Sequence, residues 1–191
     1  MLTSIYLEAL RFCVATTTAR SPTHANVKFG GYALKQNGTL LSISWFGQRD
    51  ESFWNAGPGD RHPPTEFWAE RFLEYPGDGT SGPIRRPDVA TAGKDAQETE
   101  KTVEDDKEAK VVTAGIGGHW YPYGGGAKMC PGRFFAKQEM MVAVAIMLNE
   151  FEIEPVDAVE ARKAVPDMRV FLVGALPPDR KIAMRIRRRR A

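Results

Sequence analysis

The first thirteen residues have apolar positions at the spacing of an amphipathic helix. These positions are Leu2, Ile5, Tyr6, Ala9, Leu10 and Cys13. Intervals of three and four residues place them on one stripe of a helix. The pattern begins at the second residue, without a useful capping residue before it, as it does in a truncated protein. We therefore expect an amphipathic helix here, and we expect the sequence to begin inside that helix, as a truncated protein would.

Between residues 27 and 46 the pattern changes to that of short strands. Apolar, aromatic and β-branched residues form three runs, at Val27–Phe29, Tyr32–Leu34 and Thr39–Phe46. Gly30-Gly31 separates the first two runs, and Asn37-Gly38 separates the last two. Both dipeptides are typical of tight turns between antiparallel strands. The segment predicts a small antiparallel sheet.

Two further helices are predicted later in the chain. A turn-rich stretch past Asp50 contains one short helical candidate, Thr65–Leu73. A longer helix is expected over Arg133–Asn149, and its second half is apolar on every face. Such a helix belongs in a protein interior.

Residues 91–110 are expected to form a charged disordered insertion. Residues 92–110 hold seven acids, four lysines and almost no large apolar side chain. Such a segment cannot bury enough surface to offset the entropy of ordering.

Length and composition limit the class of protein. The 191 residues carry 26 Lys+Arg against 24 Asp+Glu, which is ordinary for about one globular domain. The longest uninterrupted apolar run, Met140–Leu148, has nine residues, whereas a membrane span needs roughly 18. Two cysteines and a start unlike a signal peptide indicate a reducing compartment, not a disulfide-rich secreted scaffold.

Five of the last seven residues are arginines. A polybasic end can bind nucleic acid or acidic lipid, and an interaction module acting through this tail is one alternative function. Residues 182–187 also alternate as an edge strand whose arginines face water. We favour the strand and expect no nucleic-acid partner, because no aromatic residues interleave with the arginines to stack on bases.

The chemistry-bearing residues exclude two common kinds of site. The glycine-rich stretch Gly115–Trp120 lacks the third glycine of a dinucleotide fingerprint, and no Gly-Lys-Ser/Thr follows it. Cys13 and Cys130 lie 117 positions apart, and the histidines at 24, 62 and 119 add no zinc-ligand spacing. Neither nucleotide nor zinc binding is supported.

Cys130 has a setting that suits a single thiolate ligand. Pro131-Gly132 and the expected helix follow it directly, so free backbone N–H groups and the positive end of the helix dipole stabilise a thiolate. One thiolate is enough when a porphyrin supplies the in-plane ligands. The glycines at 124, 125, 126 and 132 let the backbone lie against a flat macrocycle without a Cβ clash. The segment describes a haem-thiolate loop.

These residues resemble the cysteine-ligand loop of the cytochrome P-450 monooxygenases. The family pattern is Phe-x-x-Gly-x-Arg-x-Cys-x-Gly, and residues 123–132 are similar to it, with the sequence Tyr-Gly-Gly-Gly-Ala-Lys-Met-Cys-Pro-Gly. This sequence is most like that of eukaryotic members of the family, fungal ones among them. The resemblance implies haem as cofactor and Cys130 as its axial iron ligand. It implies that Gly126 and Gly132 lie by the ring and that Tyr123 replaces the usual phenylalanine beside the sulfur.

Two further segments match the family in the right order. Glu8-Ala9-Leu10-Arg11 matches its Glu-x-x-Arg element, and Phe67–Phe72 resembles its Pro-Glu-Arg-Phe segment with Ala69 in place of proline. The resemblance implies a structural network of Glu8, Arg11 and Arg71 beneath the haem. Gln48–Trp54 looks like its His-Arg-Asp-Pro-x-x-Trp stretch with two departures.

The resemblance also assigns contacts around the haem. Arg20 and Lys128 would reach the two propionates, although lysine lacks the forked geometry of arginine. Segments over the ring would line a lipophilic substrate pocket. Its expected residues are Val14, Thr16, Thr18, Phe171 and Val173.

The resemblance implies a mainly α fold with small antiparallel β-sheets. Residues 1–191 would form the C-terminal, haem-binding part of the domain, an incomplete domain without the distal helix and its catalytic residues. The full-length enzyme would be a monooxygenase acting on a lipophilic substrate. Electrons would come from an NADPH-dependent reductase docking near Lys128 and Arg133.

A full-length relative would lie on the cytosolic face of the endoplasmic reticulum, held by an N-terminal anchor absent from this sequence. We expect this chain alone to be inactive. Two alternatives remain within the resemblance: a non-catalytic truncated remnant, and an isomerase of oxygenated lipids that needs no reductase.

Overall fold

A computed structural model describes residues 1–24, 27–86, 108–171 and 174–189. Its α-helices are α1 (Leu2–Cys13), α2 (Ser44–Gly47), α5 (Arg133–Glu150) and α6 (Ala158–Arg162), with single 3-10 turns at η1 (Pro58–Asp60), η2 (Gly126–Lys128) and η3 (Met168–Val170). Helices take 30% and strands 22% of the described residues, so the predicted "mainly α" character is not evident. The small antiparallel sheets are present.

The strands form five two-stranded antiparallel pairs in the described part of the chain. They are β1 (Val14–Ala15) with β9 (Gly174–Ala175), β2 (Thr17–Arg20) with β5 (Leu40–Ile43), β3 (Val27–Phe29) with β4 (Tyr32–Leu34), β6 (Leu73–Glu74) with β7 (Lys110–Val111), and β8 (Phe151–Pro155) with β10 (Met184–Arg188). Three of them join segments from distant parts of the sequence: β1 with β9, β6 with β7, and β8 with β10. The order of the sheets is therefore set by tertiary contacts.

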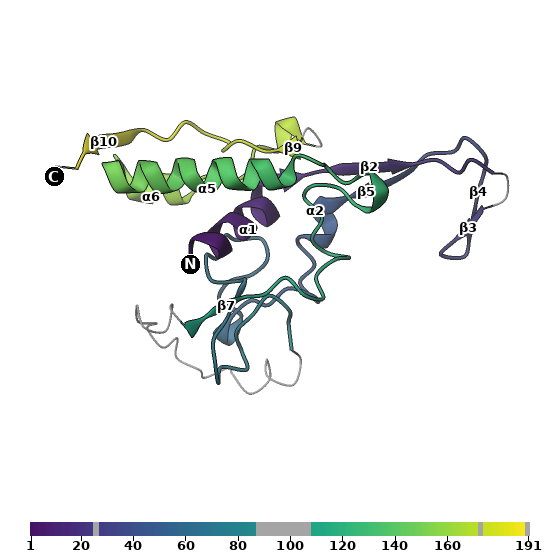
Figure 1. Ribbon diagram of the computed structural model, residues 1–191, viewed down its shortest axis with the longest axis horizontal. Helices are drawn as coiled ribbons and strands as arrows, with labels where there is room; N and C mark the ends of the chain where they lie inside the picture. The colour runs from purple at the N-terminus through teal and green to yellow at the C-terminus, as the bar shows by residue number, and fades with distance from the viewer. Residues whose placement is uncertain (25–26, 87–107, 172–173, 190–191) are drawn as a thin grey trace.

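The core lies where α1 meets the turn-rich segment. Its buried residues include Leu7, Leu10, Trp54 and Phe72, and Met141 of α5 packs against their edge. Trp54 and Phe72 are fully buried with their rings 5.7 Å apart in an edge-to-face arrangement. The loops of the turn-rich segment, which follows Asp50, lie below α1, and α5 crosses above α1 (Figure 1).

The predicted helix over Thr65–Leu73 is wrong. Its backbone groups are used in contacts with α1 instead: Trp68 N–H donates to Glu8 Oε1 at 2.9 Å, and the Ala69 carbonyl accepts from Ser4 Oγ at 2.6 Å. The Phe72 N–H also donates to Ser4 Oγ. Tertiary acceptors and donors therefore replace the helical ladder, and the segment is a series of turns that ends in β6.

The strand predicted over Thr39–Phe46 is partly wrong. Only Leu40–Ile43 is extended, and Ser44–Gly47 turns into the short helix α2. The turn at Asn37-Gly38 is present, with Asn37 at a φ of 63°. It does not join β4 to β5 as a hairpin, because β5 pairs with β2.

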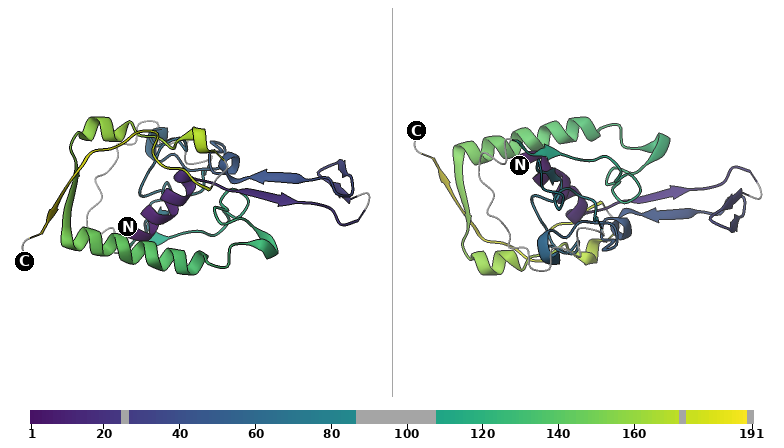
Figure 2. Two further views of the ribbon diagram at one scale, coloured as in Figure 1. Left: turned by 90° about the horizontal axis from the view of Figure 1, so that it is seen from above. Right: turned by 90° about the horizontal axis from the view of Figure 1, so that it is seen from below.

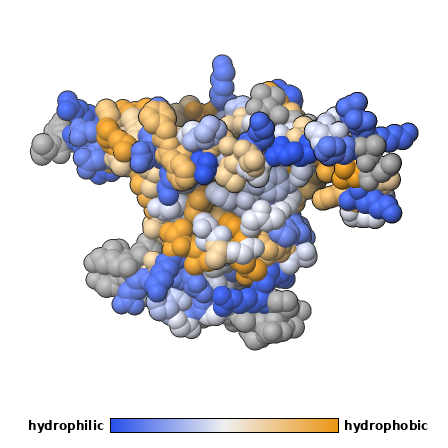
Figure 3. Space-filling model, turned by 45° about the vertical axis from the view of Figure 1, so that its right-hand side comes forward, coloured by the Kyte–Doolittle hydropathy of each residue, from blue (hydrophilic) through white to orange (hydrophobic). Residues whose placement is uncertain are grey.

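The long helix α5 forms as predicted, but it is not buried. None of its residues is buried, and Val142, Ile146 and Leu148 are each more than half exposed. The helix runs along one edge of the molecule past α1, and β8 leads from its end to α6 on the opposite edge (Figure 2). Orange residues gather at the upper left of Figure 3, where this side of the molecule lies. The prediction of an interior helix is wrong for this chain, because only the part near Met141 meets the core.

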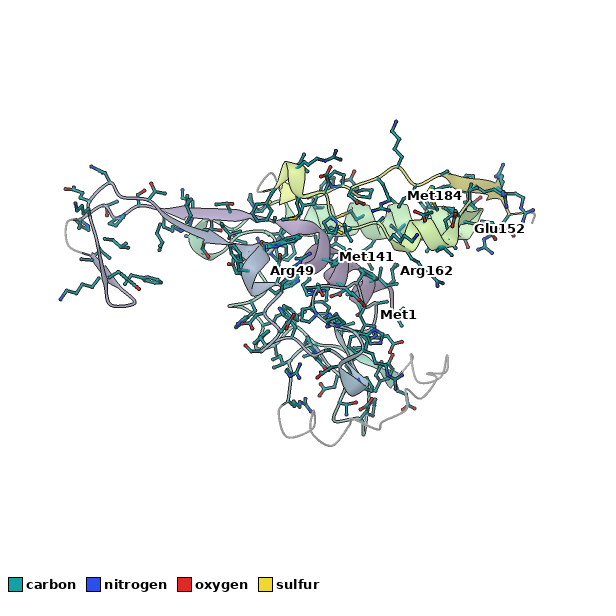
Figure 4. All side chains as sticks on the ribbon, turned by 180° about the vertical axis from the view of Figure 1, so that it is seen from behind. Met1, Arg49, Met141, Glu152, Arg162 and Met184 are labelled. Carbon is teal, nitrogen blue, oxygen red and sulfur yellow. The ribbon has the colours of Figure 1, made fainter. Side chains whose placement is uncertain are left out.

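The arginine-rich end pairs as the edge-strand interpretation predicted. In β10, Arg185 lies opposite Glu154 and Arg187 opposite Glu152. Arg187 also forms an ion pair with Glu152. The carboxylates of β8 therefore offset much of the positive charge of this end, which Figure 4 shows near the labels Glu152 and Met184.

Residues 91–107 of the predicted insertion lie outside the described residues, and Lys110, its last residue, belongs to β7. None of the described helices is both long and apolar enough to cross a membrane.

Candidate functional site

A buried charged network lies on the inner face of α1. Glu8 accepts two hydrogen bonds from Arg11, with Nε to Oε2 at 2.7 Å and Nη2 to Oε1 at 2.8 Å. Arg71, 60 positions beyond Arg11, donates from Nε to Glu8 Oε1 at 3.1 Å. All three side chains are 0% exposed. One carboxylate therefore joins α1 to the turn-rich segment.

The two guanidinium groups bind a shell of backbone carbonyls. Arg11 donates to the carbonyls of Gln48, Pro64 and Glu66. Arg71 donates to those of Asn55, His62, Pro63 and Glu66. Burial lowers the pKa of Arg71 to about 10, and Glu8 opposes the shift, so the group is charged at neutral pH. The network fixes loops 48–66 beneath α1.

Arg49 is a structural residue that the sequence singled out only as part of the Gln48–Trp54 stretch. Its guanidinium carbon lies 3.1 Å from the centre of the Trp45 ring, and its Nη2 donates to the Phe12 carbonyl at 2.8 Å. Burial, with a smaller contribution from nearby Arg11, lowers the pKa of Arg49 to about 9. The side chain clamps α2 to the end of α1, and Figure 4 labels it there. Its sequence signal was its place in the Gln48–Trp54 motif.

The segment before α5 folds into a tight loop around Cys130. Gly124 and Gly126 have φ of 77° and 66°, a region that side chains other than glycine rarely occupy. The Cys130 N–H donates to the Tyr123 carbonyl at 3.0 Å, and Arg133 Nη1 donates to the Cys130 carbonyl at 3.0 Å. The Cys130 residue is exposed and its thiol is free. The loop thus presents one thiol just before the N-terminus of an 18-residue helix.

Three side chains from the first twenty residues anchor this loop. Thr16 donates from Oγ1 to the Pro122 carbonyl at 2.5 Å. Arg20 donates from Nη2 to the Gly125 carbonyl at 2.6 Å. The hydroxyl of Tyr6 lies 2.6 Å from that of Tyr123, so the Tyr123 hydroxyl has the partner that its polarity requires. Burial and this hydrogen bond raise the pKa of Tyr6.

The other predicted site residues lie around this loop. Lys128 ends η2 and is exposed, and a Cβ built on Gly132 would lie 3.9 Å from Cys130 Sγ. Thr18 Oγ1 is 3.5 Å from the position of a Cβ on Gly124. The loop, Arg20 and Lys128 are therefore neighbours in space.

The predicted substrate-pocket segments meet in part. Val14 is buried in β1, which pairs with β9 in the late segment that also contains Phe171. The Phe171 ring packs edge-to-face on Trp45, with centroids 5.6 Å apart. Val173 lies outside the described residues. Contact of these residues with a substrate stays a prediction.

The donor set of the loop fits a haem better than a protein-bound metal cage. Among the described residues, no three His, Cys, Asp or Glu side chains gather as a metal site. A single exposed thiol fits an iron whose other ligands come from a macrocycle. A Cβ built on Gly125 would meet nothing within 4 Å, so a flat group can approach the backbone there. Arg20 supplies a cation beside the same backbone.

Comparison with known proteins gives one consistent answer. The family model for cytochrome P-450 matches residues 1–182. The chain is 40% identical over 188 residues to the cytochrome P-450 monooxygenase efuG of Hormonema carpetanum, covering 97% of this chain and 31% of that protein. It is 37% identical over 193 residues to the cytochrome P-450 monooxygenase fsoE of Humicola fuscoatra, covering 100% of this chain and 31% of that protein.

A third relative, the cytochrome P-450 monooxygenase calL of Penicillium decumbens, is 31% identical over 194 residues, which cover 98% of this chain and 30% of that protein. The chain thus spans less than a third of the length of these curated relatives. The family match over most of the chain agrees with the buried Glu8–Arg11–Arg71 network and the cysteine loop, and this chain belongs to the cytochrome P-450 family.

Proposed function

We propose that this chain forms the cysteine-ligand side of the haem site of a cytochrome P-450 monooxygenase. Cys130 is the axial iron ligand in this proposal. Arg20 and Lys128 hold the haem propionates, and Gly126 and Gly132 leave room for the ring. Three monooxygenases among the relatives support the reaction class.

One observation carries the proposal. The exposed Cys130 thiol, the open backbone of the glycine loop and the Arg20 guanidinium meet on one loop that α1 and β2 hold in place. A haem needs a thiol for its iron, an open stretch of backbone against which its flat ring can lie, and a cation for its propionates. When bound, the haem supplies reductive activation of dioxygen, which its thiolate ligand favours.

The residues of this chain hold that geometry. Thr16, Arg20 and Tyr6 bind the loop from the first twenty residues, so the thiol has a defined position relative to α1. The Glu8 network fixes α1 to the loops below it. Tyr6 and the Glu8 network act through the loop and through α1, so they are positioning residues, whereas Arg20 also contacts a haem propionate in this proposal.

We also propose the substrate class, the electron donor and the membrane location from membership in the family. The substrate is a small lipophilic molecule, and an NADPH-dependent reductase delivers electrons. The reductase would dock on the basic surface near Lys128 and Arg133, because electrostatic complementarity steers such encounters. The full-length protein would lie on the endoplasmic reticulum membrane.

The test uses a chimera, because this chain spans less than a third of its relatives. Residues 1–182 replace the matching region of the Hormonema carpetanum relative, and haem ligation is read from the spectrum of the reduced, CO-treated protein. We expect the red-shifted Soret band of thiolate ligation. Cys130→Ser should abolish that band, and Cys13→Ala should retain it, since Cys13 is a half-buried residue of α1.

A Cys130→Ser chimera with an unchanged band would overturn the ligand assignment. Product formation without any reductase would instead support the isomerase alternative. A folded chimera that holds no haem would support the remnant.

A further inference from the structure

The late segment that contains Phe171 is closed at its base by paired backbone groups. The Asp167 N–H donates to the Pro177 carbonyl at 2.8 Å, and the Asp179 N–H donates to the Val165 carbonyl at 2.8 Å. Phe171 therefore belongs to a stretch of chain whose two ends hold each other.

This segment is also fixed to the end of α1. The Leu176 N–H donates to the Cys13 carbonyl at 2.6 Å, and in the β1–β9 pair Val14 lies opposite Ala175. Figure 1 shows β9 near the start of β2. These backbone contacts place the chain around Phe171, but they do not choose the direction of its side chain, which depends on the contacts of the ring.

Trp45 of α2 makes such a contact. The centroids of the Trp45 and Phe171 rings are 5.6 Å apart, and the ring planes meet at 82°. An edge-to-face pair of this kind is a favoured aromatic geometry and adds to the free energy gained from burial alone. The direction of the Phe171 ring is therefore coupled to that of Trp45.

Arg49 in turn fixes the Trp45 ring. Its guanidinium carbon lies 3.1 Å from the centre of that ring and 5.3 Å from the centre of the Phe12 ring. Its Nη2 donates to the Phe12 carbonyl, so the guanidinium is held by the last turn of α1. Three side chains, Arg49, Trp45 and Phe171, thus connect α1 to the late segment.

We propose that Trp45 is a positioning residue for substrate selection and acts through the ring of Phe171. Phe171 is a predicted wall of the substrate pocket, and Trp45 holds its ring in one orientation. A fixed aromatic wall packs best on a flat apolar group of a substrate. The inference rests on the proposed function and on the predicted contact of Phe171 with the substrate.

The first experiment compares the affinities of the haem-loaded chimera for imidazole and 4-phenylimidazole, which bind haem iron through nitrogen and shift the Soret band. Only the larger probe carries a second ring that can pack on a pocket wall. Trp45→Ala should weaken binding of 4-phenylimidazole relative to imidazole about fivefold. Trp45→Phe keeps an aromatic ring and should retain most of the preference. A merely structural role would weaken the binding of both probes equally.

The second experiment tests whether the effect passes through Phe171. Phe171→Ala should lower the preference by a similar factor, and adding Trp45→Ala to it should lower the preference no further. Arg49→Gln should lower the preference about threefold, because it removes the guanidinium that fixes Trp45. The same change should have no effect once Trp45 is replaced by alanine.

Trp68→Ala is the matched control. Trp68 also lies under a guanidinium, with the Arg71 carbon 5.4 Å from its ring centre, and it stacks on His62 with centroids 4.7 Å apart. Neither partner belongs to the late segment. The substitution should therefore leave the preference for 4-phenylimidazole unchanged, even where it lowers the stability of the chimera.

An unchanged preference in Trp45→Ala would overturn the inference, as would an equal loss in Trp68→Ala. Losses that multiply in the Trp45→Ala, Phe171→Ala double variant would also overturn it. Phe171→Ala and Arg49→Gln decide the case if Trp45→Ala prevents folding.

The thiolate band of the unsubstituted chimera separates this inference from the proposed function. A chimera without that band would overturn the proposed function and this inference with it. A chimera that has the band, and in which Trp45→Ala leaves the preference unchanged, would overturn this inference alone.

Discussion

Glu8 is the residue with the largest expected effect on stability. Its carboxylate is the shared partner of two buried guanidinium groups, so Glu8→Ala leaves both Arg11 and Arg71 without it. Removing one partner of a buried ion pair costs about 3 to 5 kcal/mol. We expect a loss of that size in the free energy of unfolding of the chimera, measured by urea denaturation.

Glu152→Gln is the control for this prediction. Glu152 also pairs with an arginine, but the Glu152 and Arg187 side chains are 39% and 73% exposed. Exposed pairs contribute about 0 to 1 kcal/mol. Equal losses from the two substitutions would show that burial does not set the strength of the Glu8 network.

The Tyr6–Tyr123 pair gives a second prediction at the residue scale. Tyr123→Phe removes one hydroxyl of a 2.6 Å contact and leaves the Tyr6 hydroxyl without its partner in a side chain that is 9% exposed. An unpaired buried polar group costs about 1 to 3 kcal/mol, whereas removal of both partners is close to neutral. The double variant Tyr6→Phe, Tyr123→Phe should therefore recover most of the stability lost in the single one. A double-mutant cycle with strictly additive losses would contradict a direct interaction.

At the scale of elements, α5 is a helix with one buried edge. Met141 packs on the core, and Figure 4 labels it where α5 passes α1. Lys137 Nζ lies 5.9 Å from the centre of the Tyr6 ring on the same side. Val142 and Ile146, one turn apart, are 57% and 55% exposed. The helix therefore has an attached side and an open side.

The two sides should respond differently to the same substitution. Val142→Ser with Ile146→Ser should lower self-association of the 191-residue chain fused to a soluble carrier protein, because both side chains are exposed on it. Met141→Ser should lower the free energy of unfolding of the chimera by about 2 kcal/mol, because it removes a core contact. Light scattering and urea denaturation measure the two effects. Unchanged light scattering in the first variant would show that this face does not drive association.

At the scale of the molecule, the chain exposes much surface for its mass. Its accessible area is 13018 Å², whereas a compact monomer of this mass exposes about 9,000 Å². The excess includes the open side of α5 and the arm formed by the β2–β5 and β3–β4 pairs (Figures 1 and 3). Each large apolar side chain left in water forgoes about 1.5 to 3 kcal/mol of burial free energy.

We therefore expect the 191-residue chain alone to aggregate or remain partly folded, to bind hemin more weakly than the chimera, and to show no reductase-dependent turnover. Hemin titration and a turnover assay on both proteins test this. Stoichiometric thiolate-ligated haem with turnover in the chain alone would contradict it.

The sequence by itself determined the family and several elements. Cys130 with its glycine loop, the Glu-x-x-Arg pair and the Arg71 segment predicted membership in the cytochrome P-450 family, and the family match over residues 1–182 confirms it. The helices α1 and α5 and the arginine-bearing strand β10 were predicted from periodicity, because their patterns depend on local spacing alone.

Only the tertiary structure decided which partners the backbone polar groups of the turns and strands bind. Thr65–Leu73 has helical periodicity, but Glu8 and Ser4 on α1 take its backbone groups, and no local pattern encodes a partner sixty residues away. Likewise β5 pairs with β2 and not with its neighbour β4. The backbone carbonyls that accept hydrogen bonds from Arg11 and Arg71 could not be predicted from the sequence either. Every residue carries a carbonyl, and only the fold decides which ones face a buried charge.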